Sequence, residues 1–210
     1  MHTIACLHVA FGTVPLFEAA LERAQRPDGI DRVAMHHVVR PELLANVDLD
    51  GTAREVLSLS TDADAVLVVC STIGSAAEEV APVISIPVAR ADRSLATAAV
   101  DAAEPGGVVT VLYATDTTAG PTAQLFAEAT VGRDVGFELV RVDGAWPLFE
   151  AGDHRGYAER IAEVAAAMPD RNVVALAQAS MAPAATLVGR PLLGVPTVAV
   201  DAILAEMARR

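Results

Sequence analysis

The chain has 210 residues, of which 53% are hydrophobic and only 4% aromatic, and its formal charge at neutral pH is −12. This composition excludes a disordered chain and favours a core of small aliphatic residues, as in α/β proteins with parallel sheets. A negative chain without any lysine excludes a basic surface for nucleic acid, a Walker A lysine and a lysine Schiff base.

The first 17 residues carry no Lys or Arg and include Gly12 and Pro15, which is not typical of a signal peptide. The longest stretch without charge, residues 172–189, contains Gln178 and Pro183 and reads as a buried strand with a turn rather than a membrane span. We therefore expect a cytoplasmic protein without a membrane partner, in which Cys6 and Cys70 form no disulfide.

Short apolar runs bounded by Gly, Pro and Asp alternate with helical patterns along the chain. The predicted strands are residues 3–10, 33–39, 65–70, 85–89, 108–114, 137–142, 173–178 and 197–200. The predicted helices are residues 14–26, 41–59, 92–103, 121–131, 155–168 and 201–210. This alternation predicts βαβ units and mostly parallel sheets.

The second half of the sequence repeats the first. Residues 62–72 match 170–180, residues 86–92 match 195–201, and the first strand 3–8 matches 111–116. The repeat predicts an α/β fold of two similar βαβ-type halves, 1–105 and 106–210, with the C-terminal helix free to exchange between them. Such halves are expected to be related by a pseudo-twofold axis, with an active-site cleft between them at the carboxyl ends of the strands.

Cys70 is the candidate for the chemistry of that cleft. It ends a predicted strand and precedes a small polar turn that should open a helix at about Gly74. A helix N-terminus stabilises a nearby thiolate and binds carboxylates, so a thiol there could take a proton from carbon and return it. The alternative is that Cys70 is a small buried hydrophobic residue, which is the expectation for Cys6 in the middle of its strand.

Two further groups could titrate in the same cleft. The repeat puts His8 and Asp116 at equivalent ends of the first strand of each half, where either could be a partner for Cys70. The alternatives are a hydrogen-bonded strand-end histidine and a helix N-cap. His36 and His37 point to opposite faces of their strand, so they form no ready metal pair, and no metal site is predicted.

Three segments resemble the aspartate/glutamate racemase superfamily, which includes hydantoin racemases, maleate isomerases and arylmalonate decarboxylases. Residues 68–72 look like the first cysteine motif, residues 117–122 like the segment after the first strand of the second half, and residues 176–181 like the second cysteine motif. The resemblance implies a bacterial-type enzyme without a cofactor, which can be a homo-oligomer. Such enzymes hold a small carboxylate between two cysteines, while backbone amides and hydroxyls stabilise an enolate-like intermediate.

The sequence departs from that family at the second cysteine, because Gln178 occupies its position. An amide cannot exchange a proton near neutral pH, so the chain is interpreted as an isomerase of the racemase family with Cys70 as its single catalytic acid/base. A one-cysteine decarboxylase and a non-catalytic protein that binds a carboxylate or a partner are the alternatives. The predicted substrate-binding residues are His8, Ser71, Thr72, Asp116, Thr117, Thr118, Gln178, Ala179 and Ser180.

Overall fold

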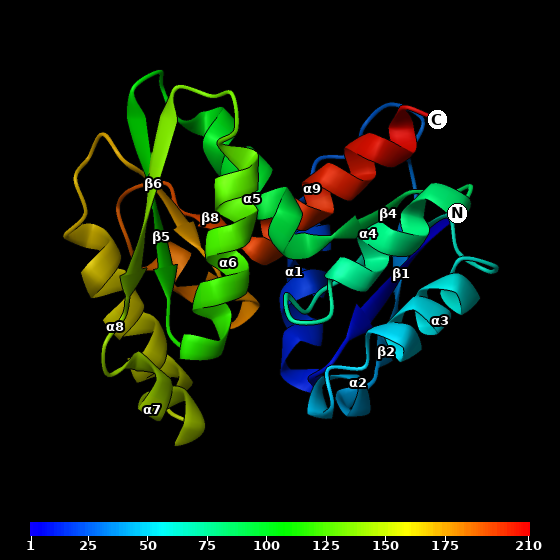
Figure 1. Ribbon diagram of the computed structural model, residues 1–210, viewed down its shortest axis with the longest axis horizontal. Coiled ribbons are helices and arrows are strands. Elements are labelled where there is room, and N and C mark those ends of the chain that lie inside the picture. The colour runs from blue at the N-terminus through cyan, green and yellow to red at the C-terminus, as the bar shows by residue number, and fades with distance from the viewer. The chain divides into compact units, whose positions relative to one another are not determined.

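The computed structural model describes residues 1–210, which group into two compact units (Figure 1). Unit 1 comprises Met1–Ser94 and Pro196–Arg210, and unit 2 comprises Leu95–Val195. These units are defined by contacts, whereas the expected halves 1–105 and 106–210 are defined by the repeat, and that division stays a prediction. No helix is long and apolar enough to span a lipid bilayer.

Unit 1 contains a four-stranded parallel sheet in the order β2-β1-β3-β4. Its strands are β1 (His2–His8), β2 (Val33–Val39), β3 (Ala65–Val68) and β4 (Val88–Arg90). Its helices are α1 (Val14–Arg23), α2 (Pro41–Ala45), α3 (Leu49–Leu59), α4 (Ser75–Val80) and most of α9 (Val195–Ala208), with short 3-10 turns at Phe11–Thr13 and Ala81–Val83.

The central strands β1 and β3 are buried on both faces, as continuous apolar strands of a parallel sheet should be. Alternate β1 residues face different layers. Ala5 and Leu7 pack with Val56 of α3 and Ala77 of α4 in one hydrophobic core. The other face of β1 carries Cys6 and His8 toward α1, where the ring of Phe17 meets that of His8 edge to face.

Unit 2 repeats this arrangement with a parallel sheet in the order β6-β5-β7-β8. Its strands are β5 (Gly107–Tyr113), β6 (Val135–Arg141), β7 (Val173–Leu176) and β8 (Leu193–Gly194). Its helices are α5 (Ala91–Ala102, which begins in unit 1), α6 (Asp116–Ala129), α7 (Ala145–Glu150) and α8 (His154–Ala166), with the 3-10 segment η3 at Ala179–Thr186. The two all-parallel sheets confirm the predicted α/β class.

Several predicted elements are wrong in kind or in position. The expected strand 197–200 lies inside helix α9, and the short strand β8 precedes it. Residues 197–200 are too few to show a period that separates a strand from a helix, and Pro196 is well tolerated in a first helical turn. Helix α6 begins at Asp116, before the expected Pro121, and α7 was not predicted.

Strand pairing gives the true register of the repeat. Val68 of β3 and Leu176 of β7 take the same place in their sheets, so Cys70 and Gln178 are equivalent, as the repeat predicts. Leu7 pairs with Val68 as Leu112 pairs with Leu176, which makes Tyr113 the equivalent of His8. The expected equivalence of His8 and Asp116 is therefore wrong, because the sequence match was shifted by three residues.

The expected match of residues 86–92 with 195–201 is also out of register. Arg90 lies opposite Val68 in one sheet, and Gly194 lies opposite Leu176 in the other. The equivalent of Arg90 is therefore Gly194, and the dipeptides Ile86-Pro87 and Val195-Pro196, which the sequence match aligned, are not equivalent in the two sheets. Helix α5 begins just after Arg90, as α9 begins just after Gly194.

Candidate functional site

Cys70 lies at the carboxyl end of a central strand. It is two residues beyond β3, and the N–H of Val69 still bonds the carbonyl of Leu7 on β1 at 3.0 Å. This is the edge of a parallel sheet where α/β proteins bind ligands. Cys70 is half-buried whereas Cys6 is 0% exposed, so Cys70 is the thiol that solvent can reach.

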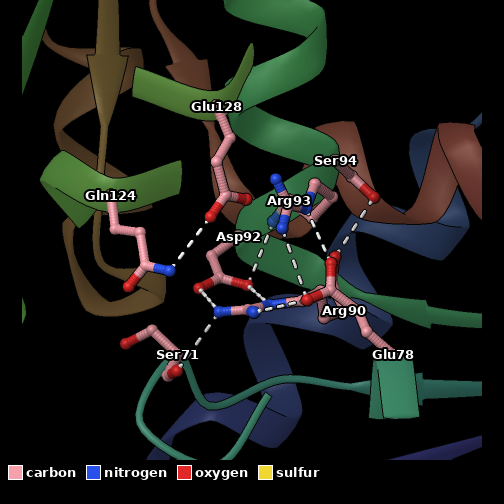
Figure 2. Close-up of polar contacts among 8 residues, drawn as sticks. All are labelled: Ser71, Glu78, Arg90, Asp92, Arg93, Ser94, Gln124 and Glu128. Atoms are coloured by element: carbon pink, nitrogen blue, oxygen red, sulfur yellow. Dashed lines mark hydrogen bonds and ion pairs between the residues drawn. The ribbon is translucent and has the colours of Figure 1, made fainter. Parts of the chain in front are cut away.

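The turn after Cys70 is held by an ion-pair network around Arg90 (Figure 2). Arg90, which is 7% exposed, bonds both carboxylate oxygens of Asp92 at 2.8 Å each and one oxygen of Glu78 at 2.8 Å. Its Nη2 also donates to the carbonyl of Ser71 at 3.4 Å. Arg93 Nε donates to the other carboxylate oxygen of Glu78 at 2.7 Å. The network thus ties the residue after the thiol to β4 and to the start of α5.

The charges of this network support one another. Burial acts against the ionised form of Glu78, but hydrogen bonds from Arg93 and Arg90 outweigh it and lower the pKa of that carboxyl below its ordinary value. Burial likewise opposes the charge of Arg90, while Asp92 and Glu78 raise the pKa of its guanidinium. A buried guanidinium with a bidentate carboxylate is a rigid support.

Ser71 and Thr72 are half-buried beside Cys70, and the next helix, α4, has Gly74 at its N-cap. The predicted helix start near Gly74 is therefore confirmed. A side chain at Gly74 would not fit, because a Cβ there would lie 2.9 Å from Arg90 Nε and 3.1 Å from the carbonyl oxygen of Cys70. The glycine lets the guanidinium lie directly against the turn.

The equivalent point of unit 2 carries an amide. Gln178 is half-buried, and its Oε1 accepts a hydrogen bond from the N–H of Ala114 at 2.7 Å. Ala179 begins η3, and the hydroxyl of Ser180 meets that of Tyr157 at 3.0 Å. Burial raises the pKa of Tyr157 to about 12, so this phenol is protonated at neutral pH and can donate.

The remaining predicted residues of unit 2 form the first turn of α6. Thr115, the N-cap, has its hydroxyl 3.0 Å from those of Thr117 and Thr118. Asp116 is exposed and lies 3.1 Å from Arg141, at the end of β6. Three hydroxyls and a carboxylate therefore gather at the carboxyl end of β5, next to the residue that Gln178 binds.

Comparisons with known proteins show which structures share this fold. No family model and no curated protein sequence matches the chain. Among solved structures, an aspartate racemase homologue from Pyrococcus horikoshii is 12% identical and matches with a TM-score of 0.67, covering 100% of both chains. A putative Asp/Glu racemase from Yersinia pestis is 13% identical, with a TM-score of 0.66 and 99% of both chains covered. An allantoin racemase from Pseudomonas fluorescens is 18% identical, with a TM-score of 0.64, 99% of this chain and 91% of that chain.

The chain has the Asp/Glu racemase fold. The resemblance stated from residues 68–72, 117–122 and 176–181 is thus confirmed at the level of the fold. Within the racemase fold, Cys70 and Gln178 stand at equivalent ends of the two central strands β3 and β7. The equivalence that the sequence predicts for these two positions is therefore confirmed by the strand register of the two sheets.

His8, a predicted partner of Cys70, is instead the hydrogen-bonded strand-end histidine that was given as its alternative. Its ring is completely buried, with Nδ1 2.7 Å from the hydroxyl of Thr13 and Nε2 2.8 Å from Nδ1 of His37. His37 continues to a carboxylate oxygen of Glu18 at 2.9 Å. Burial and the neighbouring His37 lower the pKa of His8 to about 4, so its ring is neutral at physiological pH. The sequence did not predict this series of hydrogen bonds, because His37 was considered only as a metal-binding partner of its neighbour His36.

Arg90 was also missed, although a signal was present. Arg90 lies in an otherwise apolar run, two residues before the acidic Asp92. This is unusual, because arginine is rarely buried without a paired carboxylate. The spacing of Arg90 and Asp92 could have suggested a buried ion pair. Glu78, twelve residues earlier on another element, could not have been found in this way.

Proposed function

We propose that this protein is a cofactor-independent isomerase that acts on a small carboxylate, with Cys70 as its catalytic acid/base and Gln178 in place of a second cysteine. One observation carries the proposal. The accessible thiol of the chain lies at the end of a central strand, at the position equivalent to Gln178, in a fold shared with the structures of racemases.

The thiolate of Cys70 would remove the proton from the carbon next to the substrate carboxylate. The C–H bond breaks, its proton passes to Sγ, and its electron pair moves into the carboxylate as an enolate-like anion. Backbone N–H groups of the turn that Arg90 holds, with the hydroxyls of Ser71 and Thr72, would stabilise this charge. The proton on Sγ can then exchange with solvent, and return of a solvent-derived proton to the same face of the carbon gives exchange without inversion.

Gln178 would bind rather than catalyse. Its Oε1 is held by the N–H of Ala114, so its amide N–H₂ group is the end available to donate to a substrate oxygen. Thr117, the buried Thr118, Ser180, the carboxylate of Asp116 and the backbone of Ala179 are the other residues of unit 2 that we propose as substrate-binding. His8 has partners on both ring nitrogens, so we assign it no substrate contact.

The test is exchange of substrate hydrogen in deuterated water, screened over amino acids, hydantoins, malonates and maleate. We expect the wild type to incorporate deuterium into one of these classes, Cys70→Ala to lose the incorporation, and Cys6→Ala to keep it, because Cys6 is buried away from solvent. Equal exchange by Cys70→Ala and the wild type would refute the proposal.

Two alternatives have support in the same residues. A single cysteine suffices for decarboxylation of a malonate, in which loss of CO₂ forms the enolate and the thiol protonates it once. The fixed amide of Gln178 favours a carboxylate-binding protein without catalysis. Release of CO₂ from malonates would identify the first, and stabilisation by dicarboxylates without any exchange would identify the second.

A further inference from the structure

A buried cluster of unit 1 has no part in the proposed function. Cys6 and His8 lie two residues apart on β1, so their side chains share one face of the sheet, and His37 of β2 lies opposite Cys6 in the strand register. One ligand atom from each of the three residues lies within 4.8 Å of the others. Cys6 and His8 are 0% exposed.

The outer nitrogen of each histidine is bound to oxygen. His37 Nε2 lies 2.9 Å from the carboxylate of Glu18, which can only accept, so this nitrogen carries the hydrogen. His8 Nδ1 lies 2.7 Å from the hydroxyl oxygen of Thr13, and that hydroxyl is also placed to donate to the carbonyl of Ala10 at 2.8 Å. Histidines that bind metals almost always have such outer oxygen partners, which fix the tautomer and orient the ring.

These partners direct the inner nitrogens toward a cation. When Thr13 donates to Ala10, His8 carries its hydrogen on Nδ1, and His8 Nε2 and His37 Nδ1 face each other 2.8 Å apart with a lone pair each. Two lone pairs at this distance repel unless a cation lies against both. A shared proton would bind only these two nitrogens, whereas the thiol of Cys6 lies in the same cluster and is a third possible ligand. A metal ion that also takes the thiolate of Cys6 resolves the repulsion.

We propose that Cys6, His8 and His37 form a binding site for a thiophilic divalent cation of the Zn²⁺ type. One thiolate and two imidazoles select zinc-like metals rather than Ca²⁺ or Mg²⁺, which prefer oxygen ligands. On binding, the S–H bond of Cys6 breaks, its electron pair goes to the metal and its proton leaves to solvent. The thiolate and the carboxylate of Glu18 then balance the two positive charges of the ion.

The distances require only small movements. With Zn–S of about 2.3 Å and Zn–N of about 2.0 Å, tetrahedral ligand atoms lie roughly 3.3 to 3.6 Å apart. The two nitrogens, now 2.8 Å apart, must separate slightly, and the widest separation in the cluster, at most 4.8 Å, must close. Three protein ligands leave a fourth position for a small exogenous ligand. The ion would join β1 and β2, with α1 supplying the outer carboxylate.

The site is tested by metal binding to the whole protein after treatment with a chelator. We expect Zn²⁺ to bind with a stoichiometry of one by calorimetry and to raise the melting temperature. Co²⁺ should give the near-ultraviolet charge-transfer band of a thiolate ligand together with the visible bands of tetrahedral cobalt. Glu18→Gln should weaken binding by roughly 10–100-fold, as loss of an outer partner does elsewhere.

The chain supplies matched controls for both ligand types. Cys6→Ala and His37→Gln should abolish the thiolate band and the stoichiometric binding, whereas Cys70→Ala and the exposed His36→Gln should leave both unchanged. The proposal is overturned if the wild type binds no Co²⁺ stoichiometrically, since His8 then donates directly to His37. It is equally overturned if the band survives in Cys6→Ala or disappears in Cys70→Ala. Stoichiometric Co²⁺ binding by the wild type decides the question even if one of the variants does not fold.

Discussion

Close contact between a glycine, a guanidinium and a carbonyl sets the position of Cys70. Gly74 leaves room for Arg90 against the turn, and Arg90 in turn holds the carbonyl of Ser71. Both residues therefore help to determine where Sγ of Cys70 lies, because a shift of the Ser71 carbonyl also shifts the residue before it.

Gly74→Ala tests this support. The added Cβ would lie 2.9 Å from Arg90 Nε, so either the guanidinium or the turn must shift, and we expect a loss of about 1–3 kcal/mol in the free energy of unfolding together with a lower exchange rate. Gly189→Ala is the control, because a Cβ there meets nothing within 4 Å, and its effect should stay within about 0.5 kcal/mol. Equal effects at the two glycines would contradict the role of Gly74.

The two thiols should differ in reactivity. Cys70 is half-buried, while Cys6 is 0% exposed and burial raises the pKa of its thiol far above the ordinary value. Iodoacetamide should therefore add one group to the native wild type and to Cys6→Ala, and none to native Cys70→Ala, as counted by mass spectrometry. Alkylation of Cys6 before Cys70 would show that the fold opens readily at β1.

At the scale of elements, the ion-pair network joins three segments that are far apart in sequence. Glu78 comes from α4, Arg90 from the end of β4, and Asp92 with Arg93 from the first turn of α5 (Figure 2). Helix α4 has only six residues and would be marginal alone. Its anchoring to β4 and α5 is therefore part of what keeps the turn after Cys70 in place.

This network should make the protein sensitive to acid. The pKa of Glu78 in the folded state lies below its ordinary value of 4.5, so its contribution to stability is present above pH 4.5 and is lost as the pH falls through the folded-state pKa. The stability difference between the wild type and Glu78→Gln should thus shrink as the pH is lowered from 7 toward 3. Urea unfolding measures it, with Glu79→Gln at the exposed neighbouring residue as control. A difference that does not change with pH would contradict the role of Glu78.

At the scale of the whole molecule, the two sheets share one strand order but carry different chemical groups at equivalent positions. Cys70 in one sheet and Gln178 in the other follow equivalent strands, with Val69 and Ala177 bonding Leu7 and Leu112 in the same way. The glutamine has a structural role of its own in unit 2, because its Oε1 accepts a hydrogen bond from the N–H of Ala114. The asymmetry of the two copies therefore predicts proton transfer from one face only.

Gln178→Cys restores the thiol that the family resemblance implies. If Cys70 acts alone in the wild type, this variant should raise racemisation relative to deuterium exchange, while losing about 1 kcal/mol of stability with the bond to Ala114. Gln178→Ala is the matched control, since it loses the same bond without gaining a thiol. Chiral chromatography of product formed in deuterated water measures both events, and rapid racemisation by the wild type would contradict the one-base mechanism.

The sequence by itself determined the parallel α/β class and the equivalence of Cys70 and Gln178, because strand patterns and a repeated strand-to-turn motif are local features. It could not decide whether residues 197–200 form a strand or a helix, since a short, mostly apolar run fits both. Only the tertiary structure joined Cys6, His8 and His37, and only it placed Glu78 beside Arg90. These groupings depend on strand register and helix packing, which bring together side chains that no sequence spacing connects.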